Sequence, residues 1–295
     1  MMMMALAVAV VAVLLSCEKV VMDQGDERAR EADANVTLSI AGLESYSDGV
    51  RGQTAVTEAC TRLCFAVYQD GERLKNITQK AGDADYGVVR VQLEPGTYQV
   101  LILGHSGKAN PTTTQVTKIQ FTNASASGGT GYTDTFYYYG SITVGDEPAE
   151  ASFVLKRAVA MLRFVTNDVK PAEVRHLDFY YTGGSGALDA TTGYGCVNSK
   201  QSVTVETDTT LDGQPLQYDL YTFLHDEEGA LSLTVTATDA DGQVLYQRTF
   251  DGIAMARNTI THFSGTFFTE EQGGGDGRCT MTVDTDWADT RYLQY

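Results

Sequence analysis

ALSLTVTATD, residues 230–239, alternates between apolar and hydroxyl-bearing side chains from its second residue onward. One face would carry Leu231, Leu233, Val235 and Ala237, and the other would carry the serine and threonines. Successive residues of a β-strand point to opposite faces, so this period of two predicts a strand with one buried face and one wet face. No segment of comparable length shows a helical period, and we therefore expect an all-β protein.

Short β-branched or aromatic runs, bounded by Gly, Asn, Asp or Pro, recur along the chain in two series. The first series is VTLSI (36–40), LCFAVYQ (63–69), YGVVRVQL (86–93), TYQVLIL (97–103), TKIQF (117–121) and FYYYGSITV (136–144). The second series starts near Ala151 and closes with NTITHFSGTFF (258–268). We expect two tandem antiparallel β-sandwich domains, residues 36–150 and 151–268, that meet between Gly145 and Arg157.

The N-terminus reads as an export signal. Residues 1–16, MMMMALAVAVVAVLLS, are apolar and uncharged, and they are shorter than the roughly 20 residues that span a bilayer. Leu14–Cys17 resembles the bacterial lipobox, which predicts cleavage between Ser16 and Cys17 and a lipid such as palmitate on Cys17. The alternative is an ordinary signal peptide with an incidental cysteine, and the usual basic n-region is missing. Residues 17–35 read as a flexible polar tether.

The charge balance excludes some partners. The 295-residue chain has 38 acidic and 21 basic residues, which is a formal charge of −17. Nucleic acid is not expected, because phosphate binding needs clustered Lys and Arg. An anionic lipid surface would also repel this chain, so membrane attachment would depend on the lipid at Cys17.

Candidate chemistry is sparse. If Cys17 carries lipid, Cys60, Cys64, Cys196 and Cys279 remain, and sequence alone does not choose among their three pairings. Cys60 and Cys64 are too far apart on an extended strand to join, so a bond between them would need a turn or helix. The chain has no CxxC pair and only isolated histidines, so no metal or other cofactor is expected. No nucleophile, metalloprotease or phosphate-loop motif occurs, and we expect a protein that is not an enzyme.

The C-terminal residues 269–295 differ in composition from the rest of the chain. TEEQGGGDGR (269–278) reads as a flexible hinge, and CTMTVDTDW (279–287) reads as a strand. This strand, with Met281, Val283 and Trp287, is a candidate donor that would pair with a neighbouring molecule. The alternative is that it returns to the edge of its own sheet.

FYYY, residues 136–139, suggests a competing function. Exposed aromatic side chains can stack on sugars, which would suit a surface glycan-binding lipoprotein of a polysaccharide-uptake system. On a strand, however, alternate residues point to opposite faces, so at most two of the four could share one platform. We expect core packing on one face and an exposed pair on the other, with Tyr137 and Tyr139 as the residues to test.

The order of segments, more than any single motif, resembles the fimbrillin superfamily. The resemblance rests on the lipobox, VYQDGERL, LEPGTYQVLILG, ASFVLKRAVAMLRFVTND and RNTITHFSGTFF. It is strongest at Leu155-Lys156-Arg157, which runs into VAMLRF, and at Arg257-Asn258, which opens the last core strand. Within the superfamily the chain looks most like the FimB-type anchor subunits of Gram-negative anaerobes.

This resemblance implies a fold of two transthyretin-like sandwiches. It also implies a lipoprotein of the outer membrane that is exposed on the cell surface. The implied role is cell adhesion, as an anchor or accessory subunit of a fimbria (pilus). Its partners would be other fimbrial subunits, joined by β-strand addition. Stalk subunits of the superfamily lose an N-terminal strand by cleavage after a basic residue. Arg51 is the candidate cleavage position here, with Arg28 and Arg30 as rivals, whereas anchors keep both the lipid and the strand.

Overall fold

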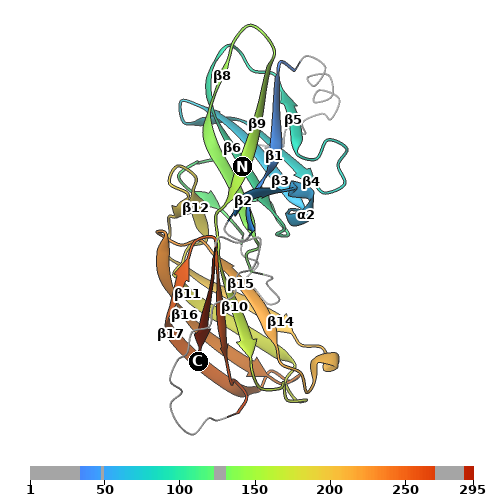
Figure 1. Cartoon of the computed structure of the whole chain (residues 1–295), viewed down its shortest axis with the longest axis vertical. Coiled ribbons are helices and arrows are strands. Elements are labelled where there is room, and N and C mark those ends of the chain that lie inside the picture. The colour runs from blue at the N-terminus through green and yellow to red at the C-terminus, as the bar shows by residue number, and fades with distance from the viewer. Residues whose placement is uncertain (1–33, 48–49, 123–130, 270–288) are drawn as a thin grey trace, which may run out of the picture.

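The structure is a computed structural model that describes residues 34–47, 50–122, 131–269 and 289–295. Figure 1 shows two β-rich bodies stacked along the long axis of the molecule, with most of the blue-to-green half of the chain in the upper body and the yellow-to-red half in the lower one. The predicted all-β fold is confirmed. In the described part of the chain, no helix is both long and apolar enough to cross a membrane.

The N-terminal body is a sandwich built from one 8-stranded sheet that folds over itself. One layer contains β1 (Val36–Ser47), β2 (Val50–Thr54), β5 (Val88–Val91) and β9 (Ala149–Arg157). The other contains β3 (Arg62–Gln69), β4 (Glu72–Lys80), β6 (Gly96–His105) and β8 (Thr135–Val144). The layers stay joined where Phe136 and Tyr137 of β8 pair with Arg157 and Lys156 of β9, and a short helix, α2 (Val56–Ala59), connects β2 to β3.

The C-terminal body is a second sandwich. One layer has the order β15 (Gln217–Thr222), β10 (Ala160–Thr166), β18 (Thr259–Gly265) and β19 (Asp289–Gln294). The other has the order β14 (Ser199–Glu206), β11 (His176–Gly184), β16 (Glu228–Thr238) and β17 (Val244–Ala256), and a 3-10 turn, η1 (Thr209–Leu211), precedes β15. In β16 the predicted alternation is confirmed, because its four predicted apolar positions lie in the core between the layers.

The two bodies share a third apolar cluster at their junction. A three-stranded sheet of β7 (Ile119–Gln120), β12 (Ala187–Asp189) and β13 (Tyr194–Gly195) joins the halves through the β7–β12 pair. The strands β3 and β6 are buried on both faces, which explains their continuous apolar runs. Their inner residues enter the N-terminal core, and their outer residues meet the C-terminal half in a cluster that includes Tyr68, Leu101, Leu103, Met161, Leu188, Phe223 and Ile260.

Two features of the predicted organisation need correction. The sheets are not purely antiparallel, because β1 pairs with β9, β10 with β18 and β18 with β19 in the parallel sense. The division after residue 150 falls inside β9, which pairs with β1 over most of its length. The chain leaves the first sheet after Arg157 and enters the second at Ala160, because β9 completes the N-terminal core through Phe153 and Leu155.

Candidate strand-exchange site

The first strand of the chain fills a slot in the N-terminal sandwich. β1 lies between β9, which it meets in parallel from Val36↔Ala149 to Leu43↔Leu155, and the antiparallel strand β5. Val36, Leu38 and Leu43 of β1 are at most 1% exposed, so the strand supplies core side chains as well as backbone hydrogen bonds. Loss of β1 would therefore open a groove with two unpaired backbone edges and an apolar floor.

Asn35 holds the beginning of this strand. Its side-chain amide donates to Leu93 O at 2.8 Å, and its side-chain oxygen accepts from Leu93 N at 2.9 Å. The backbone carbonyl of Asn35 accepts from Ala149 N at 2.8 Å. Because these bonds reach the chain on both sides of β1, the strand is bound to the N-terminal body from its first residue.

The predicted cleavage residue lies directly after this strand. Arg51 belongs to β2, where it is paired with Tyr46 across the β1–β2 hairpin. Cleavage after Arg51 would leave β1 attached to the rest of the body only through its contacts with β5, β9 and the remainder of β2. Arg28 and Arg30, the rival positions, lie outside the described residues.

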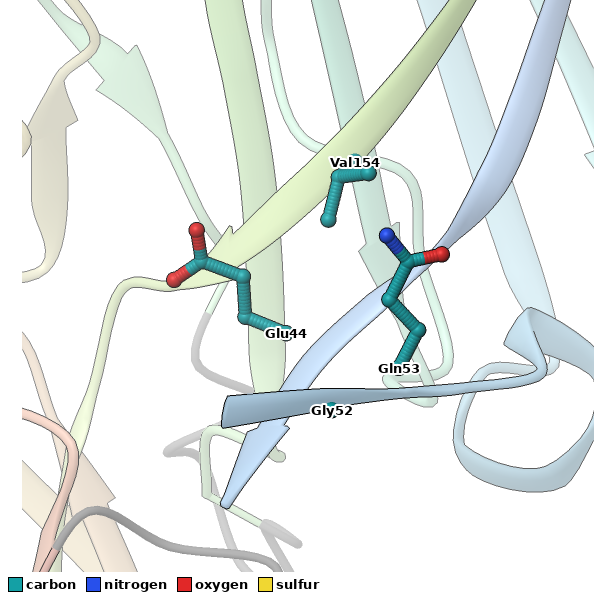
Figure 2. Close-up of a pocket in the computed structure, with 4 residues that line it drawn as sticks. All are labelled: Glu44, Gly52, Gln53 and Val154. Carbon is teal, nitrogen blue, oxygen red and sulfur yellow. The ribbon is translucent and has the colours of Figure 1, made fainter. Parts of the chain in front are cut away.

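A hollow of about 390 Å³ opens beside this hairpin, and Figure 2 shows its lining residues Glu44, Gly52, Gln53 and Val154. Glu44 and Gln53 are partners in the β1–β2 register and project to the same side as Val154 of β9. The hollow thus combines one carboxylate, one amide and an apolar wall next to Arg51. These groups form no catalytic constellation, and the feature belongs to the hairpin surface.

The other end of the chain occupies an edge of the C-terminal sandwich. β19 pairs with β18 in parallel register from Thr259↔Asp289 to Ser264↔Gln294, and β18 in turn pairs with β10. Figure 1 places the C-terminus on this edge of the lower body. The last described strand therefore completes the chain's own sheet, whereas the predicted strand 279–287 lies outside the described residues.

Tyr295 anchors this strand through its side chain. The ring of Tyr295 stacks on Phe164 with a centroid distance of 5.3 Å, and its centroid lies 4.6 Å from that of Phe250 and 4.7 Å from that of Phe263. Its hydroxyl donates to Val165 O at 3.0 Å, and its backbone N–H donates to Ser264 O at 2.9 Å. Burial raises the pKa of Tyr295 above its usual range, with a further contribution from the charge of Asp168. We call Phe164, Phe250 and Phe263 the aromatic cage.

Asp168 holds the chain where it leaves β18. Its Oδ1 accepts a hydrogen bond from Phe267 N at 2.8 Å, and its Oδ2 accepts from Phe268 N at 2.6 Å and Thr269 N at 2.8 Å. Bonds from backbone amides to a carboxylate are charge-assisted and stronger than bonds between neutral groups. The last residues before the C-terminal tail are therefore held in place independently of β19.

Several predicted site residues lie outside the described residues. These are the signal-cleavage pair Ser16 and Cys17 and the candidate donor-strand residues Met281, Val283 and Trp287. The strand that the structure does describe begins two residues beyond Trp287. The role of Tyr295 was not predicted; its sequence signal is an aromatic residue two positions after the apolar Leu293, the spacing of side chains on one face of a strand.

One family model covers most of this architecture. The description of that model is a family of unknown function, DUF6562, and the match extends over residues 26–292. The chain belongs to the DUF6562 family. The match includes β1, both sandwiches and the start of β19. A search of curated protein sequences found no match.

Solved structures with a similar arrangement have low sequence identity to this DUF6562 chain. A candidate adhesin from Bacteroides ovatus is 15% identical, with a TM-score of 0.48, 72% of this chain covered and 82% of that one. The fimbrial anchor protein Mfa2 from Porphyromonas gingivalis is 13% identical, with a TM-score of 0.39 and coverages of 72% and 80%. A fimbrial assembly protein from Parabacteroides distasonis is 13% identical, with a TM-score of 0.40 and coverages of 78% and 90%.

The cysteines of this DUF6562 member do not form disulfides within its described residues. Cys60, Cys64 and Cys196 are free thiols, and Cys279 lies outside the description. Burial raises the pKa of Cys60 to about 12 and that of Cys64 to about 11, so neither is an activated nucleophile. No cluster of three or more His, Cys, Asp or Glu side chains among the described residues could hold a metal ion.

The aromatic run in β8 differs from the expected exposed pair. Tyr138 packs into the N-terminal core, with its ring centroid 4.5 Å from that of Phe153. Tyr137 and Tyr139, on the opposite face, are partly buried against the cluster at the junction of the two bodies. The C-terminal half covers the face that a sugar platform would need, so the geometry gives no support to the glycan-binding alternative.

Proposed function

We propose that this DUF6562 chain is a non-catalytic subunit of a cell-surface fimbria that acts as its anchor or as an accessory component. The observation that carries the proposal is the placement of β1 as a central strand with a buried apolar face. A sandwich whose central strand comes from one end of the chain is suited to strand addition, since a strand of another subunit could fill the same slot.

The filled slot is the state expected of an anchor, which keeps its first strand, whereas a stalk subunit would reach an open slot only after cleavage. With β1 in place, both β5 and β9 are already paired along the slot, so this molecule would not accept a neighbour's strand there. A subunit that donates a strand but accepts none terminates a fibre. The lipobox-like sequence before Cys17 supports the same role, because it would attach the terminal subunit to the outer membrane by a lipid and not by charge.

The proposed donor is the C-terminal tail. Met281 and Val283 alternate with threonines in the segment that ends at Trp287, which is the side-chain pattern that a neighbouring subunit's slot would read. Other fimbrial subunits are therefore the expected partners. Deletion of residues 279–295 should abolish assembly while leaving lipid attachment intact, whereas normal assembly without the tail would contradict the donor role.

The anchor role is tested by labelling cells of the native bacterium with a palmitate analogue. We expect the wild-type chain to take up the label and Cys17→Ser to lose it and to release fimbriae into the medium. Cys196→Ser is the matched control, because Cys196 is an exposed free thiol, and it should keep both label and surface fimbriae. A lipid-free surface form that begins at Gly52 would show cleavage after Arg51 and would contradict the anchor role.

A further inference from the structure

The first strand, β1, begins at the opposite end of the β1–β9 pair from the exit toward the C-terminal body. Val36 is paired with Ala149 at the start of β9, and Leu43 is paired with Leu155 near its end. β9 then leads through two residues into β10 of the C-terminal body. Figure 1 shows β1 and β9 side by side in the upper body, with β9 running down toward the lower one. The parallel pairing thus separates the two points at which the chain enters and leaves the pair.

This arrangement decides how tension would act on β1. A pull on the chain before Asn35, opposed by a hold on the C-terminal body, drives β1 toward its own start and β9 toward its own end. The hydrogen bonds of a parallel pair are evenly spaced along the strands, so such a pull loads them together. If β1 were antiparallel to β9, both attachment points would lie at one end of the pair, and the same pull would break the bonds one after another.

Sliding of β1 would also displace buried side chains and the bonds of its first residue. Val36, Leu38 and Leu43 lie in the N-terminal core. Asn35 is held by two side-chain bonds to the backbone of Leu93 and by a bond from its carbonyl to β9. A shift of one residue turns every buried side chain of a strand to the other face. The resistance to sliding is therefore concentrated at the first step of the movement.

The connection from β9 to the C-terminal body is short and tightly held. It consists of Ala158 and Val159, which are both buried. The backbone N–H of Ala158 donates to Thr135 O at 2.8 Å, and the carbonyl of Val159 accepts from Asn258 N at 2.9 Å. Arg157, the last residue of β9, donates to the side chain of Asn258 at 2.9 Å. Tension would therefore pass from β9 into the C-terminal body without extension of a linker.

We infer that the N-terminal body bears tension along the chain, with β1 and β9 loaded in shear, that is, pulled along their length in opposite directions. The inference deepens the proposed function and rests on it for the source of the tension, since an anchor would be pulled between its lipid and the fibre. The arrangement of the two strands is a property of the single chain, so its test uses purified protein and no fimbriae.

The test compares two directions of pulling on the same strand. Full chains made without export, so that Cys17 stays a free thiol, are held in an optical trap by Cys17 and by one introduced cysteine. Cys196 and Cys279 are changed to serine. Lys156→Cys, exposed near the end of β9, gives the shear direction. Glu147→Cys, exposed just before β9, is the matched control, because it puts both attachment points at one end of the pair and peels β1 away.

We expect the first rupture in the shear direction to need a force several times larger than in the peeling direction, at the same loading rate. Urea denaturation of the two variants should agree, because the direction of pulling does not enter an equilibrium measurement, whereas forced unfolding is governed by the unfolding rate. Asn35→Ala should lower the rupture force in the shear direction, through loss of the two side-chain bonds to Leu93.

Equal rupture forces in the two directions would overturn the inference, because the β1–β9 pair would then not set the resistance. Unequal forces in the purified chain, together with normal fimbriae in cells that lack this protein, would refute the fimbrial role and leave the load-bearing pair standing. Equal forces, together with loss of fimbrial attachment in those cells, would do the reverse.

Discussion

Arg157 Nη1 donates a hydrogen bond to Asn258 Oδ1 at 2.9 Å, although 101 residues separate the two in the chain. Arg157 ends β9 of the N-terminal body, and Asn258 lies in the turn before β18 with a φ of 53°. Asn258 also donates its backbone N–H to Val159 O at 2.9 Å. The two segments that most strongly carried the sequence resemblance thus meet at the junction between the sandwiches.

Replacement of Arg157 by glutamine should destabilise the protein strongly. The guanidinium is largely buried, and its Nε lies 2.8 Å from Asp134 Oδ1, so the change removes this largely buried ion pair. We expect the free energy of unfolding to fall by about 3 kcal/mol, measured by urea denaturation. Arg163→Gln, which breaks the more exposed pair with Asp219, is the control and should cost less than about 1 kcal/mol. Equal losses would contradict a special role for the junction.

Tyr295 should contribute more through its ring than through its hydroxyl. Tyr295→Phe removes the bond to Val165 O and should lower the free energy of unfolding by roughly 1 kcal/mol. Tyr295→Ala also empties the aromatic cage and should cost on the order of 3 kcal/mol. Hydrogen exchange should show faster exchange along β19 and the facing edge of β18 in the alanine variant. Unchanged exchange there would show that the ring does not hold the strand.

Gly265→Ala should displace the C-terminus without a direct change to the tail. The added methyl group would overlap the carbonyl oxygen of Tyr295, so the terminal residue must move out of the cage. We expect raised hydrogen exchange in β19 and a smaller change elsewhere. Gly145→Ala is the control, because a Cβ at that position meets no atom within 4 Å. A Gly265→Ala variant with wild-type exchange in β19 would contradict the close approach.

His105 should make stability depend on pH. Its Nδ1 accepts a bond from Gly107 N at 3.1 Å, and its buried Nε2 has no hydrogen-bond partner among the described residues. Burial, with a smaller contribution from the charge of Arg62, lowers the pKa of His105 from 6.5 to about 4.

The sign of this effect follows from the lowered pKa. Between pH 6.5 and about pH 4 the unfolded chain binds a proton at His105 that the folded chain does not, so stability is full above pH 6.5 and falls as the pH decreases through this window. The loss is on the order of 3 kcal/mol at the low end. Urea denaturation at several pH values should show this step in the wild type and not in His105→Gln. The same slope in both proteins would contradict the assignment.

Local patterns predicted most of the strands, although not β2 or β4. The alternation in residues 231–237 predicted a half-buried strand, and β16 has that pattern because one of its faces meets the core. The runs LCFAVYQ and TYQVLIL also predicted strands, but their continuous apolar character carried further information. The continuous apolar runs reflect burial of β3 and β6 on both faces. Tyr137 and Tyr139 were expected to be exposed, but they are partly buried against the cluster shared with the C-terminal half.

The sequence by itself determined the all-β class and the approximate position of most strands, because alternation and turn residues act over a few neighbours, but it did not predict β2 or β4. Only the tertiary structure decided that β1 and β9 run in parallel, that β9 belongs to the first body, and that Tyr295 seats beside β18. The pairing of β1 with β9 and the hydrogen bond from Tyr295 to Val165 both join residues about 100 or more positions apart. The position of Tyr295 also depends on which edge of the sheet remains open. Such contacts follow from the packing of whole layers, which no short pattern of side chains encodes.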